Sequence, residues 1–143
     1  MKWVTRHNAM VDRIACPWLI RKFVDPKAEF IYVPSEQVAD VAAKGAIPYD
    51  VQGVELGHKD GRCSFESIID KYQLRDPALG LLANIVHGAD VSADIGLTPE
   101  AAGLKAIAEG FALVYGTRDQ EKLAAESPVY DALYEWCRKR AAA

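Results

Sequence analysis

The sequence has no long apolar run and no excess of positive charge. No stretch approaches the roughly 18 apolar residues that read as a membrane-spanning helix. Lysine and arginine number 17 against 20 aspartate and glutamate residues, for a formal net charge of −3. No overall basic field would therefore draw the chain to nucleic acid. We expect neither a membrane protein nor a stand-alone nucleic-acid-binding protein.

Cysteine is also scarce, and its pattern bears on the compartment. There are three cysteines in 143 residues, an odd number at irregular spacing, which does not predict a disulfide framework. The first residues lack the apolar segment of a signal peptide. We therefore expect a cytoplasmic protein with reduced thiols. The sequence contains no phosphate loop, dinucleotide fingerprint, serine-nucleophile elbow or zinc-finger spacing.

The amino-terminal part alternates β-prone and helical segments. The length of the whole chain, 143 residues, suits a single domain over residues 1–143. We predict a helix that begins at Pro17, with Ala15 or Cys16 as its cap, because proline is tolerated in a first helical turn but not in a helix interior. A shorter helix should span residues 35–45. The predicted strands cover residues 3–6, 29–33 and 47–51, the last at an edge because of Pro48.

The carboxy-terminal half is predicted to be mostly helical. Helices should begin near Ser64, Pro77 and Pro99. A short helix over residues 118–125 and a separate last helix from Ser127 complete the pattern. The predicted fold class is therefore α+β or α/β, with a small three-stranded β-α-β-α-β unit followed by a mostly helical half.

The segment from Gly53 to Glu66 holds the densest group of potential metal or proton ligands in the chain. It contains His58, Cys63 and Glu66 between two glycine turns and the start of a predicted helix, and His87 and Asp90 follow one predicted helix later. Imidazole and carboxylate ligands together suit zinc, iron or manganese. We predict a divalent metal site on His58, Glu66, His87 and Asp90. The alternative is that His58 is a solvated loop residue and that His87 interacts with the carboxy-terminal end of its helix.

Two cysteines lie at predicted helix starts, where the helix dipole lowers a thiol pKa. Cys63 precedes Ser64, and Cys16 precedes Pro17. Either thiol could act as a nucleophile or an electron donor. The alternative is that each is a small buried apolar residue.

Three arginines lie around the first predicted strand and helix, namely Arg6, Arg13 and Arg21. Beside the free N–H groups of a helix start, they would form an oxyanion site. The alternative is ordinary ion pairing with nearby aspartates, such as Asp12 or Asp50.

Several blocks of the sequence resemble the C-terminal domain family of the chromate-resistance protein ChrB. The first is Asp12-Arg-Ile-Ala-Cys-Pro-Trp-Leu-Ile-Arg21, and the resemblance covers nearly the whole chain. The further blocks are residues 30–34, 53–58, 63–66, 85–90, 100–104 and 130–136. The resemblance implies a link to chromate resistance but brings no settled reaction. Some members carry an additional amino-terminal region associated with regulation; it is not in this sequence, so we do not expect DNA binding.

Together these observations favour a cytoplasmic metal-binding protein of chromate resistance or oxidative-stress defence. Arg13 and Arg21 would attract an oxyanion such as chromate, and Cys63 or Cys16 would supply electrons. Two alternatives stay open: a non-catalytic chromate sensor that uses the arginines, and a thiol-dependent chromate reductase. Whether the protein is an enzyme is left open, and so is assembly into a homo-oligomer.

Overall fold

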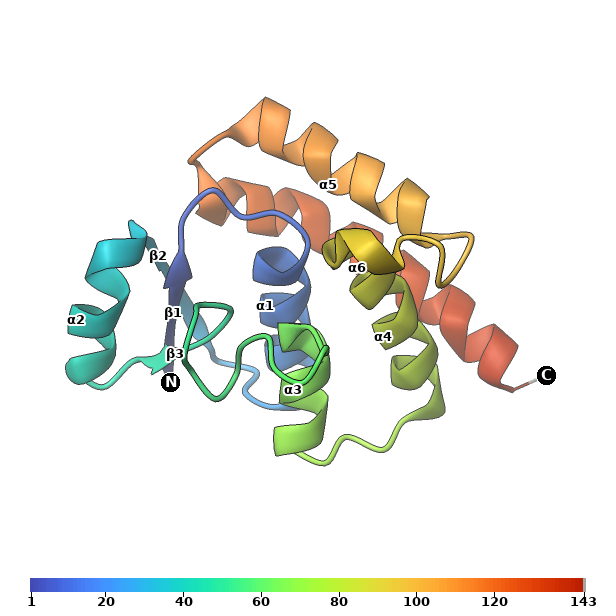
Figure 1. The fold of residues 1–143 in the computed structure, drawn as a ribbon, viewed down its shortest axis with the longest axis horizontal. Coiled ribbons are helices and arrows are strands. Elements are labelled where there is room, and N and C mark those ends of the chain that lie inside the picture. Colours follow the sequence, from blue (N-terminus) through green and yellow to red (C-terminus); the bar gives the residue numbers. More distant parts are fainter. Residues whose placement is uncertain (143) are drawn as a thin grey trace.

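A small parallel sheet forms the amino-terminal part of the computed structural model, which describes residues 1–142 (Figure 1). Its strands are β1 (Lys2–Arg6), β2 (Glu29–Val33) and β3 (Ile47–Pro48), in the order β2-β1-β3. Both outer strands run parallel to β1. The predicted three-stranded unit is confirmed. β3 is shorter than predicted because Asp50, two residues after it, has a φ of 50°, which extended backbone does not adopt.

The two faces of the sheet are covered by different helices. Alternate residues of β1 point to opposite faces, and Trp3 belongs to the main core with α1 (Asp12–Phe23). Val4 instead packs with Val38 in a smaller cluster. That cluster lies under α2 (Val38–Ala43), which follows the short helix η1 (Ser35–Gln37). In Figure 1 the sheet accordingly lies between α1 and α2.

The remaining chain is helical, as predicted. It comprises α3 (Ser64–Lys71), α4 (Pro77–Asp90), η2 (Ser92–Asp94), α5 (Ala101–Tyr115) and α6 (Asp119–Ala141). The contact of α6 with α1 is aromatic, with ring centroids of Trp18 and Tyr134 5.5 Å apart. The Trp18 indole N–H also donates to Asp131, at 2.8 Å. No helix formed by residues 1–142 is both long enough and apolar enough to cross a membrane.

Two predicted helix boundaries at prolines are wrong. Helix α1 begins at Asp12 and contains Pro17 in its interior. A proline has no N–H to donate to the carbonyl four residues before it; that carbonyl, of Arg13, instead accepts a 2.6 Å hydrogen bond from the Tyr32 hydroxyl. The sheet thus supplies the donor that the helix lacks.

The second correction concerns α6, which is one helix through Pro128 rather than two. The Ser127 hydroxyl donates to the Leu123 carbonyl at 2.6 Å in the turn before the proline. Tyr130 and Tyr134 beyond it are buried in the core. Apolar burial on both sides of Pro128 offsets its cost of about 3 kcal/mol.

Candidate metal centre and anion pocket

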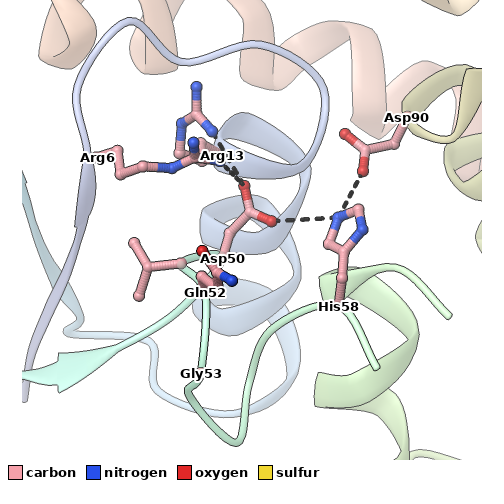
Figure 2. Close-up of a pocket in the computed structure, with 8 residues that line it drawn as sticks. Arg6, Arg13, Asp50, Gln52, Gly53, His58 and Asp90 are labelled. Atoms are coloured by element: carbon pink, nitrogen blue, oxygen red, sulfur yellow. Dashed lines mark hydrogen bonds and ion pairs between the residues drawn. The ribbon is translucent and has the colours of Figure 1, made fainter. Parts of the chain in front are cut away.

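Three carboxylates from separate elements converge on one imidazole. Figure 2 shows two of them, Asp50 and Asp90, on either side of His58. His58 lies on the loop before α3, Asp12 at the start of α1, Asp50 after β3, and Asp90 at the end of α4. The Nε2 atom of His58 is 2.8 Å from Asp90 Oδ2, 3.3 Å from Asp12 Oδ2 and 3.4 Å from Asp50 Oδ1. Asp12 and Asp50 are buried, whereas the His58 side chain is 48% exposed. The cluster is therefore anchored in the core and open to solvent at His58.

The loop that carries His58 depends on a close backbone approach at Gly57. A Cβ atom at position 57 would lie 2.8 Å from the carbonyl oxygen of Val51, closer than real Cβ contacts. The same loop is closed by the Asp50 N–H, which donates to the Leu56 carbonyl at 2.9 Å. A glycine at position 57 thus lets the chain fold back and place His58 beside Asp50.

Ser64, the first residue of α3, fixes two of the carboxylates. Its backbone N–H donates to Asp12 Oδ2 at 2.8 Å, and its hydroxyl donates to Asp50 Oδ1 at 2.6 Å. The start of a helix favours negative charge because its N–H groups are free and the helix dipole is positive there. Both oxygens that face His58 are consequently held in place by α3.

The cluster brings three carboxylates to one imidazole, and their closeness and burial shift the pKa values. Burial, together with the charge of Asp90, raises the pKa of Asp12 to about 8. Its second oxygen, Oδ1, is buried and has no hydrogen-bond partner among residues 1–142. Hydrogen bonds with Asp12 and Asp50 raise the pKa of His58 to about 10. A cation bound here would replace the protons of His58 and Asp12 as the partner of the buried carboxylates.

The spacing of three of these atoms fits ligands of one ion. Two ligands bound at about 2.1 Å with a tetrahedral angle between them lie about 3.4 Å apart. The distances from His58 Nε2 to Asp12 Oδ2 and Asp50 Oδ1, 3.3 and 3.4 Å, match this value. One ligand atom from each of Asp12, Asp50 and His58 lies within 4.8 Å of the other two. Asp90 lies only 2.8 Å from the same nitrogen, closer than two ligands of one ion, so its contact with His58 is a direct hydrogen bond.

A second histidine cluster has a different geometry. His87 Nδ1 is 2.5 Å from Glu66 Oε1, and His87 Nε2 is 2.6 Å from Asp94 Oδ2. Two ligands of the same ion would be at least about 3.0 Å apart, so 2.5 Å is the distance of a direct hydrogen bond. Glu66 also accepts the Cys63 N–H at 3.0 Å and thereby caps α3. This cluster joins α3, α4 and η2.

The four residues predicted as one metal set therefore divide between two groups. His58 and Asp90 belong to the cluster with Asp12 and Asp50, whereas Glu66 and His87 belong to the second cluster. From the sequence, Asp12 and Asp50 are expected to be ion-pair partners of the arginines rather than metal ligands. The signal that points to Asp50 is its position directly after a strand of a parallel sheet, where ligand sites form.

Two of the three predicted arginines line a pocket beside His58. The pocket has a volume of about 400 Å³ and is bordered by Arg6, Arg13, Asp50, Val51, Gln52, Gly53, His58 and Asp90. Arg13 donates to Asp50 Oδ2 at 3.2 Å. Arg6 is 3.9 Å from the same oxygen, and its side chain is 45% exposed. Figure 2 shows both guanidinium groups on the Asp50 side of the pocket.

Arg21 is not part of this pocket. Its guanidinium lies over the Phe30 ring, 4.9 Å from the centroid, and donates to the Ala28 carbonyl. The predicted cluster of three arginines is therefore a pair, because Arg21 lies in the last turn of α1 and Arg13 in its first.

The thiols predicted as reactive lie in the core. Cys16 and Cys63 are fully buried, and both are free. Burial, and the negative charge of Asp12, raise the pKa of each thiol above its ordinary value. These surroundings favour the protonated thiol, which is neither a nucleophile nor a metal ligand.

A match to a known protein family covers every residue of both clusters. The family described as "ChrB, C-terminal domain" matches residues 3–137. Protein ChrB of Cupriavidus metallidurans (strain CH34) is 37% identical over 112 residues, which are 76% of this chain and 32% of that protein. The chain thus spans about a third of the length of the curated relative it matches. No solved structure matches.

Proposed function

Because this chain belongs to the ChrB C-terminal domain family, we propose that it serves in chromate resistance as a divalent-metal protein. The ion would be held by Asp12, Asp50 and His58, with Asp90 beside them. An oxyanion such as chromate would bind in the adjoining pocket. A role in oxidative-stress defence stays a prediction.

One observation carries the metal site: carboxylate oxygens of Asp12 and Asp50 lie 3.3 and 3.4 Å from His58 Nε2, the spacing of two ligands on one ion. The unpartnered, buried Oδ1 of Asp12 supports it, because a buried carboxylate oxygen without a donor is costly unless a cation compensates it. The ligand set is rich in oxygen and has one imidazole. Such a set suits manganese, iron or zinc.

The charges around the pocket support the binding of an oxyanion next to the proposed metal ion. A divalent ion together with Arg6 and Arg13 would outweigh the three carboxylates of the cluster. Arg13 is held by Asp50 and by the Asn8 carbonyl, at 2.9 Å, while Arg6 is partly exposed and has only a long contact with Asp50. A guanidinium presents a fork of N–H groups that suits oxyanions.

The free state of the cysteines supports the proposal that the protein works in a reducing compartment. Cys16, Cys63 and Cys137 are all free and buried, which suits the cytoplasm, where thiols stay reduced. We therefore keep the cytoplasm as the proposed location.

The test is metal content by mass spectrometry after loading with Mn²⁺, Fe²⁺ or Zn²⁺ and desalting. Wild-type protein should retain about one ion per chain, and His58→Ala and Asp12→Asn should lose it. The other two histidines provide matched controls, since His87→Gln and His7→Ala should retain the ion. Absence of metal from the wild type, or loss in His87→Gln with retention in His58→Ala, would refute the proposal.

A further inference from the structure

The pocket beside His58, which Arg6 and Arg13 line, continues into a larger groove under α2. Arg6, Val51 and Gln52 border both spaces. The groove has a volume of about 580 Å³ and is otherwise lined by Ser35, Val38, Ala39, Ala42, Pro48 and Val54. A ligand at the polar end could therefore extend into the groove without leaving the protein surface.

The groove is mostly apolar, unlike the pocket that it joins. Its α2 side presents Ala39 and Ala42, whose short side chains leave the space open. On the opposite side, Pro48 on the edge strand β3 and Val54 on the following loop add apolar surface. A small concave apolar surface next to a few convergent polar groups is the usual form of a small-molecule site.

Arg6 lies at the junction of the two spaces. Its side chain is 45% exposed, and its only ion pair within residues 1–142 is the 3.9 Å contact with Asp50. The guanidinium is therefore available to a ligand charge at the point where polar lining gives way to apolar lining. A bare tetrahedral oxyanion such as chromate has no part that would occupy the apolar space.

We propose that this site takes a small organic anion, a carboxylate that bears a short alkyl chain or a single aromatic ring. Its carboxylate binds beside Arg6 and the metal cluster, and its apolar part lies in the groove against α2. The position of the carboxylate rests on the metal centre proposed above, whereas the position of the apolar part rests on the groove alone. Chromate then competes for the charged end of the site.

The first experiment compares carboxylates that differ only in their apolar part. Acetate, hexanoate and benzoate are titrated calorimetrically into zinc-loaded protein, with benzamide as the uncharged control. Because burial of about 55 Å² of apolar surface corresponds to about a tenfold gain in affinity, hexanoate and benzoate should bind at least about tenfold more tightly than acetate. Benzamide should bind more weakly than benzoate, since it lacks the charge that Arg6 pairs with.

Two variants on α2 test where the apolar part of the bound carboxylate lies. Ala42→Phe fills the groove and should remove the advantage of benzoate over acetate. Ala43→Phe, one residue further along α2 on an exposed position outside the groove, should leave it unchanged. Arg6→Gln should weaken acetate and benzoate alike.

The outcomes separate this proposal from the metal centre. Metal content measured on the same samples decides the metal site independently of the anions. Equal affinity for acetate and benzoate, or a benzoate advantage that survives Ala42→Phe, would overturn the organic-anion proposal even in a fully metal-loaded protein. If the protein takes up no metal on loading but keeps a benzoate advantage that Ala42→Phe abolishes, the metal centre is refuted and the groove is supported.

Discussion

The Tyr32 hydroxyl donates a 2.6 Å hydrogen bond to the carbonyl of Arg13. Tyr32 lies on β2 and Arg13 in the first turn of α1, one residue after the Asp12 carboxylate of the metal cluster. The bond satisfies the carbonyl that Pro17 leaves free and lets α1 begin at Asp12. The sheet and the site are therefore linked through this pair.

Removing the Tyr32 hydroxyl should destabilise the fold. Tyr32→Phe leaves the Arg13 carbonyl without its donor, a loss of about 1–2 kcal/mol in the free energy of unfolding. Urea denaturation measures it. Tyr115→Phe on α5 is the matched control and should change stability by less than about 0.5 kcal/mol. Equal stability of Tyr32→Phe and the wild type would show that the bond contributes nothing.

Metal should stabilise the folded chain through Asp12. At a free zinc concentration of about 100 times Kd, binding adds about 2.7 kcal/mol, so Tm should rise by about 5–10 °C for a chain of this size. Asp12→Asn should lose this rise. Asp70→Asn, which changes a carboxylate on the exposed side of α3, should keep it. A zinc-induced rise that persists in Asp12→Asn would place the ion elsewhere.

The His87 imidazolium should stabilise the protein most below its ordinary pKa of 6.5. Burial lowers the pKa of His87, but hydrogen bonds with Asp94 and Glu66 raise it more, so it lies above the ordinary value of 6.5. The folded state thus holds the proton more tightly than the unfolded state, and the stabilisation is fully present below pH 6.5. It is lost as pH rises through the raised pKa.

The comparison of wild type with His87→Gln tests this sign. The difference in free energy of unfolding should be on the order of 1–2 kcal/mol at pH 5.5 and should shrink toward pH 9. Metal-free protein in chelator removes any contribution from an ion. A difference that stays constant or grows with pH would contradict the assignment of an imidazolium between Glu66 and Asp94.

Glu126 on α6 should also make the fold less stable as pH rises, because its charged form is unfavourable in the core. Both its carboxylate oxygens are buried without a hydrogen-bond partner in the described chain, and burial raises its pKa from 4.5 to about 7. The folded state favours the neutral acid, so stability falls as pH rises from 4.5 to 7. Glu126→Gln should therefore be more stable than the wild type at pH 8, by about 1–3 kcal/mol, and nearly equal to it at pH 4.5.

The exposed Glu109→Gln on α5 is the control, because Glu109 only pairs with Lys105 on the surface. It should show no such gain at pH 8. A Glu126→Gln variant that is less stable than the wild type at pH 8 would mean that the carboxylate has a partner in solution.

Local sequence signals predicted most elements but not their continuity through proline. The run from Glu29 to Val33 is β-branched and aromatic, and it forms β2 as expected. The start of α1 was misplaced because the donor that compensates Pro17 comes from Tyr32, on another element. Periodicity within one segment contains no information about such a partner.

The same limit applies to the site. His58 and Asp90 were predicted because they lie in dense groups of polar residues. Asp12 and Asp50 stand singly beside apolar segments, and only the parallel sheet and α3 bring them to His58. His87 was grouped with His58 on residue type, whereas its distances to Glu66 and Asp94 are those of direct hydrogen bonds.

The position of a bound ion tests the metal centre most directly. Crystals of zinc-loaded protein, measured at the zinc absorption edge, should give one anomalous peak with about 2.0–2.2 Å to Asp12, Asp50 and His58. A peak at Cys63, Glu66 and His87 instead, or no peak at full zinc loading, would contradict the assignment.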